Sequence, residues 1–194
     1  MLKNDYYNFV FVHIQKTAGT SITAALKQIP GTHNTHMTHG YLKNYNYPKE
    51  YFKFCFVRNP WDRLVSWYNM HKNLKTLSPF PTYTMKNTNS FSDFLKKTEF
   101  TEEYGIKKSI YYNQLDYVSD DEGNILVDFI GKYENLNEDF NKIKEKLNLK
   151  DIEIPVLNKL RKDGDDYRKY YTDEEIALVS KMYEKDINYF NYKF

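Results

Sequence analysis

A lysine, a glycine and three hydroxylated residues follow one another near the start of the chain, where an apolar run ends. The run is FVFVHI (9–14), and the stretch after it is QKTAGTS (15–21). The first backbone N–H groups of a helix have no partner inside the helix, so a strand-to-helix turn attracts anions. Lys16 adds a cation, and Gly19 lets the backbone approach a ligand closely. The stretch therefore predicts a site for an anion of phosphate or sulfate size. The alternative is a plain turn, capped by Thr or Ser, with Lys16 in solvent.

The position of the lysine separates this loop from the Walker A motif. In that motif the lysine directly follows the second glycine, whereas Lys16 precedes Gly19, the only glycine of the loop. This order counts against a small P-loop kinase, which is one alternative function for the chain.

A second cation stands at the end of another predicted strand. Arg58 directly follows YFKFCFV (51–57), and Pro60 is placed to open a helix. The guanidinium of Arg58 is a planar fork that suits phosphate oxygens. Ser66 lies about two helical turns further on, where it could face the same ligand. Two such junctions predict a ligand with two separated anionic groups. An ion pair between Arg58 and Asp62 is the alternative.

Strands and helices alternate along the sequence. Short apolar runs predict strands at 8–14, 51–57 and 125–133. Amphipathic spacing predicts helices at 20–29, 61–74, 90–98, 137–149 and 172–190. A capping box of Thr172 and Glu175 opens the last helix. This alternation predicts an α/β domain with a mainly parallel central sheet flanked by helices. Ligands of such sheets bind where strands end and helices begin, and both junctions lie at such places.

Composition and charge limit the class of protein. The net charge is only +2 over 194 residues, which argues against a protein that coats nucleic acid or anionic membrane. Cys55 is the only cysteine, so no intrachain disulfide can form, as suits a reducing compartment. No apolar run reaches the roughly 18 residues of a membrane span, and the N-terminus lacks the pattern of a signal peptide. We therefore expect an unexported, cytoplasmic protein.

The two junctions resemble the donor-binding motifs of the Golgi-type carbohydrate sulfotransferases (sulfotransferase family 2), which are related to heparan sulfate 2-O-sulfotransferase. HIQKTAGTS (13–21) is similar to the family's 5′-phosphosulfate loop, usually H-I-P-K-T-A-G-T-S, with Gln15 in place of the proline. FCFVRNPWDRLVSWY (54–68) is similar to its 3′-phosphate element. DFIGKYENLNEDF (128–140) and YTDEEIALVSKMYEKDINYFNY (171–192) resemble later family segments. The likeness runs in order over most of the chain.

The resemblance implies a single P-loop-like sulfotransferase domain over residues 1–194. The donor would be 3′-phosphoadenosine 5′-phosphosulfate (PAPS), and the product adenosine 3′,5′-bisphosphate (PAP). Lys16 would reach the oxygen that bridges phosphorus and sulfur, and Arg58 and Ser66 would hold the 3′-phosphate. The loop residues implied in binding the 5′-phosphate are Thr17, Ala18, Gly19, Thr20 and Ser21. No metal is required, because a sulfuryl group carries less charge than a phosphoryl group.

A basic loop near the C-terminus resembles the family's flexible segment over the 3′-phosphate and adenine. Its candidate residues are Lys159, Arg161 and Arg168. The alternative for each of them is a solvated side chain in a basic loop.

Sulfuryl transfer also needs a base that takes the proton of the acceptor hydroxyl. Histidine is the commonest general base because it titrates near neutral pH. His39 and the glycine after it resemble in placement the His-Gly stretch that holds the base of uronyl 2-O-sulfotransferases. We expect His39 to be the base, with His36 second and Glu50 as the acidic alternative. His13, on the strand before the loop, is expected to be structural.

Together these expectations describe a sulfotransferase that moves a sulfuryl group from PAPS to an acceptor hydroxyl by in-line displacement. The family favours a carbohydrate acceptor, although no residue pattern selects one. Residues 77–118 are expected to shape that choice. Besides the kinase, the remaining alternative is a non-catalytic module that binds a nucleotide or a carbohydrate.

Overall fold

The computed structural model describes residues 1–35, 39–73, 88–100, 110, 112–149, 152–155, 157 and 165–194. The chain divides into two compact units, which are described separately. The first comprises Met1–Arg58 and Gln114–Asn158, and the second comprises Asn59–Asn113 and Lys159–Phe194.

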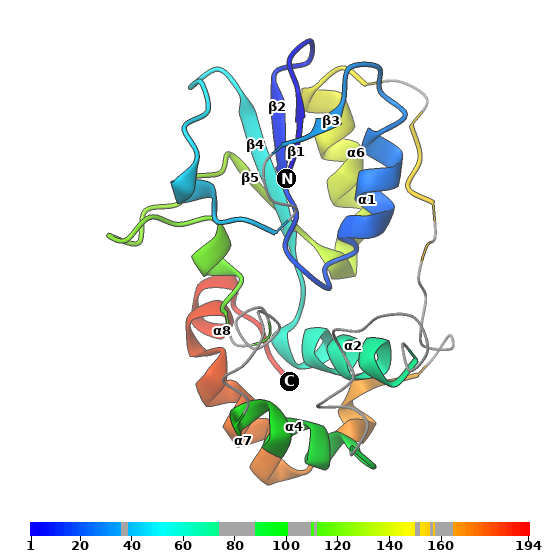
Figure 1. The fold of residues 1–194 in the computed structure, drawn as a ribbon, viewed down its shortest axis with the longest axis vertical. Coiled ribbons are helices and arrows are strands. Elements are labelled where there is room, and N and C mark those ends of the chain that lie inside the picture. Colours follow the sequence, from blue (N-terminus) through cyan, green and yellow to red (C-terminus); the bar gives the residue numbers. More distant parts are fainter. Residues whose placement is uncertain are drawn as a thin grey trace. The chain divides into compact units, whose positions relative to one another are not determined.

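A five-stranded sheet, counted over the described residues, organises the first unit (Figure 1). The strand order is β3-β1-β2-β4-β5. The strands are β1 (Leu2–Asn4), β2 (Phe9–Val12), β3 (His33–Asn34), β4 (Phe52–Val57) and β5 (Phe129–Lys132). β2, β4 and β5 pair in parallel, whereas β1 pairs antiparallel with β2 and β3. The parallel centre confirms the predicted α/β fold.

Helices α1 (Gly19–Leu26) and α6 (Leu136–Lys146) lie side by side on one face of this sheet (Figure 1). Their apolar faces pack with the phenylalanines of β2 and β4 in one buried cluster, which includes Ile22, Phe140 and Ile143. All four residues of β2 are buried, which explains why its sequence is continuously apolar and not alternating. Both β2 and β4 end at buried residues, Val12 and Val57.

The sheet departs from the prediction at its margins. β1 and β3 were not predicted, because segments of three and two residues carry no readable period. The strand expected at 125–133 is confined to β5. Ile125 instead forms an isolated antiparallel bridge with Ser119.

Within its described part, the second unit contains helices α2 (Pro60–Asn73), α4 (Phe91–Phe100), α7 (Asp173–Met182) and α8 (Glu184–Phe190). Pro60 opens α2 as predicted, and the Asn59 side chain caps it by accepting from the N–H of Trp61 at 3.1 Å. Thr172 and Glu175 form the predicted capping box. The described residues also form four 3-10 turns, which are η1 (Leu42–Asn44), η2 (Leu115–Tyr117) and η3 (Tyr133–Asn135) in the first unit and η4 (Tyr167–Tyr170) in the second.

The single helix predicted over 172–190 is wrong, because α7 ends before Tyr183 and α8 begins after it. Tyr183 leaves the helical region, with φ −114° and ψ 30°. Val179, Tyr183 and Phe190 are all buried on either side of this break.

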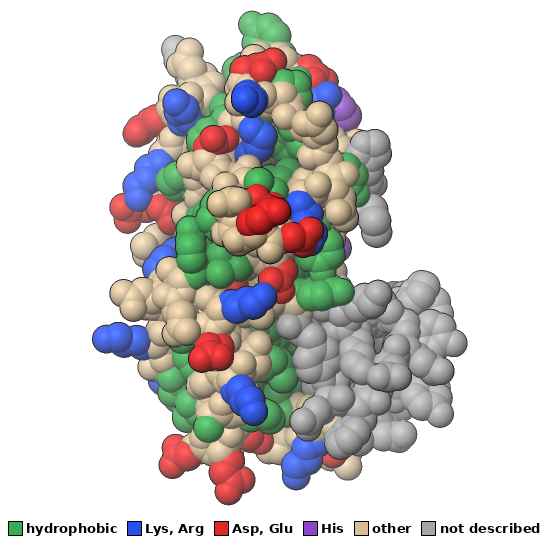
Figure 2. Space-filling model, turned by 90° about the vertical axis from the view of Figure 1, so that its left-hand side faces the viewer, with side chains coloured by type: hydrophobic (Ala, Val, Ile, Leu, Met, Phe, Trp, Pro, Cys, Tyr) green, Lys and Arg blue, Asp and Glu red, His purple; other side chains and the backbone are tan. Residues whose placement is uncertain are grey.

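The surface view in Figure 2 shows Lys and Arg interspersed with Asp and Glu over the described residues of the face presented. Among the helices of the described ranges, none has the length and apolar content needed to cross a bilayer.

Candidate functional site

The loop that joins β2 to α1 contains two residues in the left-handed backbone region. Lys16 has φ 68°, and Ala18 has φ 66°. Residues other than glycine adopt this region rarely, at a cost of roughly 1–2 kcal/mol each. Turns with left-handed residues direct successive N–H groups to one side and bind anions there. The loop therefore has the backbone form of an anion-binding turn.

The start of α1 lacks a side-chain cap. Its N-cap residue is Ala18, which makes no capping hydrogen bond. This finding contradicts the alternative that Thr or Ser caps the turn. Because helix N–H groups need partners, an uncapped start next to Lys16 suits a bound anion.

The three hydroxyls of the loop have different surroundings. Thr17 is fully buried, and its Oγ1 donates to the carbonyl oxygen of Ile14 at 2.9 Å. Ser21 accepts from the backbone N–H of Leu157 at 3.2 Å. Thr20 is exposed. The side chains of Thr17 and Ser21 thus hold the protein's own backbone, and the Thr20 hydroxyl is the one that faces solvent.

Gly19 is fixed by a packing contact with His13. A Cβ atom built at Gly19 would lie 1.9 Å from Cδ2 and Nε2 of the His13 ring. The backbone of Gly19 needs no left-handed conformation, so the imidazole alone excludes a side chain there. His13 therefore sets the path of the chain where the loop enters α1, in line with the expected structural role.

His39, the expected base, contacts the strand end that leads into the loop. Its Nδ1 lies 3.0 Å from the carbonyl oxygen of His13, and the two rings meet edge-on with centroids 4.5 Å apart. A carbonyl oxygen only accepts, so Nδ1 of His39 carries the proton and Nε2 keeps a lone pair. Burial is the main cause that lowers the pKa of His39 below its ordinary value. The ring is thus neutral near pH 7, in the tautomer that a base at Nε2 requires.

Burial, the neighbouring His39 and the N-terminal amine lower the pKa of His13 to about 3. His13 is therefore neutral at physiological pH.

The other two candidates for the base are His36 and Glu50. His36 lies outside the described residues. Glu50 is exposed and precedes β4, at the amino end of a strand six residues long. Lys16 follows the carboxyl end of the parallel strand β2. A strand of this length separates the two edges of the sheet by about 20 Å, so the structure does not bring Glu50 to the loop.

Arg58, at the carboxyl end of β4, reaches the Lys16 loop directly. It is 5% exposed, and its Nη1 donates to the carbonyl oxygen of Lys16 at 3.2 Å. Its guanidinium carbon lies 3.9 Å from the ring centroid of Tyr133, a half-buried residue at the end of β5. Its backbone is held by the side chain of Gln114. The ends of β2, β4 and β5 thus meet around this arginine.

Sequence reasoning missed both Tyr133 and Gln114. The end-of-strand rule that selected Lys16 and Arg58 could have found Tyr133, because it closes the predicted strand at 125–133. Gln114 carries no such signal, since it precedes a short 3-10 turn far along the chain.

The remaining predicted site residues are Ser66, Lys159, Arg161 and Arg168. Ser66 is a half-buried residue of α2, in the second unit. Lys159 and Arg161 lie outside the described residues. Arg168 is exposed in η4 and pairs with Asp166 at 3.2 Å. In the described ranges no group of three or more His, Cys, Asp or Glu is placed to hold a metal ion.

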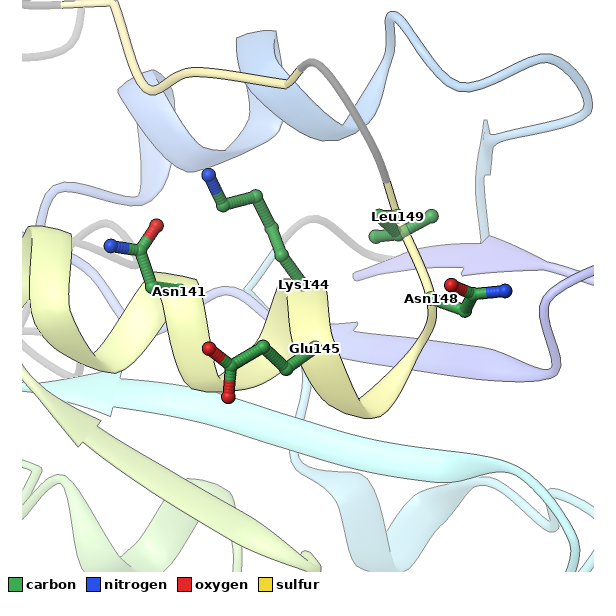
Figure 3. A pocket seen from close by; sticks show the side chains of 5 residues that line it. All are labelled: Asn141, Lys144, Glu145, Asn148 and Leu149. Atoms are coloured by element: carbon green, nitrogen blue, oxygen red, sulfur yellow. The ribbon is translucent and has the colours of Figure 1, made fainter.

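A separate surface depression of about 340 Å³ lies at the end of α6 (Figure 3). Its lining residues are Asn141, Lys144, Glu145, Asn148 and Leu149. None of them is a predicted site residue. Because α6 runs antiparallel to β5, its last turn lies near the amino ends of the parallel strands, whereas the Lys16 loop lies at their carboxyl ends (Figure 1).

Comparison with known proteins identifies the family. The model of the Sulfotransferase family matches residues 1–193. An uncharacterized protein of Archaeoglobus fulgidus is 36% identical over 120 residues, which are 61% of this chain and 84% of that protein. The crystal structure of mouse sulfotransferase SULT7A1 complexed with PAP has a TM-score of 0.56 to this structure at 16% identity. That match covers 96% of this chain and 86% of the mouse chain, and it shows a shared fold. Because the family model spans nearly the whole sequence, this chain belongs to the sulfotransferase family.

Proposed function

We propose that this protein transfers a sulfuryl group from PAPS to a hydroxyl of an acceptor, with residues 1–194 acting as one sulfotransferase domain. Family membership supports the reaction class. The fold shared with a sulfotransferase that was crystallised with PAP supports the donor. The observation that carries the proposal is the loop between β2 and α1, where left-handed Lys16 and Ala18 precede an uncapped helix start.

The loop residues fit a 5′-phosphosulfate group. PAPS supplies the sulfuryl group, and the backbone N–H groups of Thr17 to Ser21 bind the phosphate that remains. The Lys16 ammonium stabilises the negative charge that this phosphate gains during transfer. Since the side chains of Thr17 and Ser21 hold backbone groups of the protein, the loop would bind mainly through its amides and the Thr20 hydroxyl.

Arg58 is the residue that we propose to bind the 3′-phosphate of the donor. Its guanidinium is buried at the carboxyl ends of the parallel strands, within hydrogen-bonding distance of the Lys16 carbonyl. Here a permanent cation stabilises a second anionic group and also holds the loop that binds the first. The sequence motifs add Ser66, Lys159 and Arg161 to the residues that we propose for binding this phosphate.

His39 is the proposed general base. Its protonated Nδ1 is occupied by the His13 carbonyl, so Nε2 is the atom that takes the proton of the acceptor hydroxyl. His36 remains the second candidate. We propose a carbohydrate hydroxyl as the acceptor, on the strength of the family motifs.

Two measurements test the proposal. Calorimetric titrations compare PAP with Mg²⁺-ATP, and we expect binding of PAP with much weaker binding of ATP. Incubation with ³⁵S-labelled PAPS and a panel of mono-, oligo- and polysaccharides then detects transfer. Preference for Mg²⁺-ATP would indicate a kinase. PAP binding without transfer to any acceptor of the panel, or to simple phenols and alcohols, would indicate a binding module.

A further inference from the structure

The side chain of Gln114 pairs with both polar groups of the Arg58 backbone. The N–H of Arg58 donates to Oε1 of Gln114 at 2.8 Å, and Nε2 of Gln114 donates to the carbonyl oxygen of Arg58 at 2.8 Å. Gln114 is 0% exposed and lies 56 residues away along the chain. One buried carboxamide thus satisfies both backbone polar groups of Arg58.

These two hydrogen bonds resemble the pair that a neighbouring strand would make with the Arg58 backbone. The register of β4 with β2 runs to Cys55, and its register with β5 runs to Val57. Arg58 is the next residue. A carboxamide has an acceptor oxygen and a donor NH2 group in the same plane, much as a peptide group has its C=O and N–H. Gln114 therefore extends the backbone hydrogen bonding of β4 by one residue, at the point where the strand ends before α2.

Holding the Arg58 backbone fixes the direction in which its side chain leaves the sheet. From there the guanidinium stacks on Tyr133, at 3.9 Å from the ring centroid, and its Nη1 donates to the Lys16 carbonyl at 3.2 Å. That carbonyl belongs to a residue in the left-handed region, with φ 68°. A hydrogen bond from a cation to this carbonyl stabilises a backbone form that lysine otherwise disfavours.

We infer that Gln114 is a positioning residue of the donor site, which acts through Arg58 on the conformation of the Lys16 loop. The inference rests on the proposed function, because it takes PAP as the ligand of that loop. According to this inference, Gln114 contributes to donor affinity although its own side chain does not contact the donor.

Three variants test this. Gln114→Leu removes both hydrogen bonds at similar volume. Gln114→Glu keeps the acceptor for the Arg58 N–H but places a carboxylate oxygen against the Arg58 carbonyl. Val118→Ala is the matched control, since it opens a small cavity at another fully buried residue of the same unit. Thermal unfolding of each variant reports its general loss of stability.

PAP affinity is measured by calorimetry at a temperature where all variants are folded. We expect Gln114→Leu and Gln114→Glu to weaken PAP binding about tenfold or more, the effect of at least one hydrogen bond. Val118→Ala should keep the wild-type affinity despite its lower unfolding temperature.

A second readout needs no ligand. The Nε–Hε resonance of Arg58, assigned with an Arg58→Lys spectrum, should be displaced by the ring current of Tyr133. We expect this displacement in the wild type and in Val118→Ala, and its loss in both Gln114 variants. If the wild type fails to bind PAP, the proposed function fails, while this resonance still decides whether Gln114 positions Arg58.

The inference is overturned if a folded Gln114 variant keeps both the wild-type PAP affinity and the displaced resonance. It is also overturned if Val118→Ala loses as much PAP affinity as Gln114→Leu. Should Gln114→Leu not fold, Gln114→Glu decides by the same two criteria.

Discussion

His39 Nδ1 lies 3.0 Å from the backbone carbonyl oxygen of His13, the residue whose ring excludes a side chain at Gly19. One residue at the end of β2 thereby touches two parts of the proposed site. Its carbonyl sets the tautomer of the proposed base, and its ring sets the path of the anion-binding loop. His13 thus links the proposed base to the loop, and it directly follows a strand that is buried along its whole length.

Replacing His39 tests its role as the base. We expect His39→Ala to lower kcat by about 10² to 10⁴, the usual contribution of a general base, and to leave PAP affinity unchanged. Steady-state rates and calorimetric titration measure the two effects. His36→Ala is the comparison variant and should keep most of the activity. A dead His36→Ala beside an active His39→Ala would transfer the role to His36.

The pH dependence of activity follows from the environment of His39. Burial lowers its pKa below the ordinary 6.5, so the neutral form dominates at lower pH than for a solvated histidine. We expect kcat to rise with pH through a midpoint below 6.5 and to be flat from about pH 7 to 8. A profile of kcat against pH at saturating donor and acceptor checks this. A midpoint above 7 would contradict a buried, neutral base.

Stability should also depend on pH, through His13. Its pKa is lowered from 6.5 to about 3 in the folded protein, mainly by burial. Between these values the unfolded chain binds a proton that the folded protein does not. The free energy of unfolding therefore falls as pH falls below 6.5, by up to about 1.4 kcal/mol per pH unit from this group. Urea unfolding between pH 7 and 5 measures the slope.

His13→Phe is the control for that slope, because it keeps an aromatic ring and cannot titrate. It should unfold with a smaller pH dependence than the wild type over the same range. Equal slopes for the two proteins would mean that His13 is not buried in its neutral form.

The contact between Gly19 and His13 predicts a coupled pair of substitutions. Gly19→Ala places a Cβ atom 1.9 Å from the His13 ring, and overpacking of this kind costs about 1–3 kcal/mol. His13→Ala removes the ring, so the double variant should lose much less stability than the sum of the two single changes. Chemical unfolding of the four proteins gives the coupling energy. Additive effects would contradict the contact.

The parts of the site that follow from local pattern were predictable. Arg58 directly follows a buried apolar run, and Lys16 follows one with only Gln15 between them. Their place at the carboxyl ends of parallel strands therefore follows from the alternation of strands and helices. Tyr133 ends a predicted strand in the same way. Thr172 and Glu175 form a cap within four residues, where sequence distance and spatial distance agree.

What depends on tertiary contacts was not predictable. Neither lysine nor alanine favours positive φ, so the left-handed turn at Lys16 and Ala18 has no signal in residue type. The Gln114 side chain reaches Arg58 only because the sheet brings together segments that are 56 residues apart. β1 becomes a strand through its register with β2, which pairs Leu2 with Phe11.

Arg58 should be sensitive to the shape of its side chain as well as to its charge. We expect Arg58→Ala to weaken PAP binding by tenfold or more, since it removes a charge-assisted hydrogen bond and the stacking on Tyr133. Arg58→Lys keeps the charge but lacks the planar fork, so it should recover only part of the affinity. Lys181→Ala, at an exposed position of α7, is the control for loss of positive charge. Full recovery in Arg58→Lys would mean that charge alone matters.

Lys16 combines a side chain with a proposed function and a strained backbone, and two substitutions separate these properties. Lys16→Ala and Lys16→Gly both remove the ammonium group, so both should lower kcat by about 10² to 10³, the effect of losing one electrostatic contact to the leaving group. They differ in the backbone, because glycine accepts φ 68° and alanine does not. Lys16→Gly should therefore unfold with a free energy about 1 kcal/mol above that of Lys16→Ala. Rates with labelled PAPS and urea unfolding of the two variants measure both effects. Normal turnover in either variant would remove Lys16 from the mechanism, whereas equal stabilities would show that position 16 is not left-handed in solution.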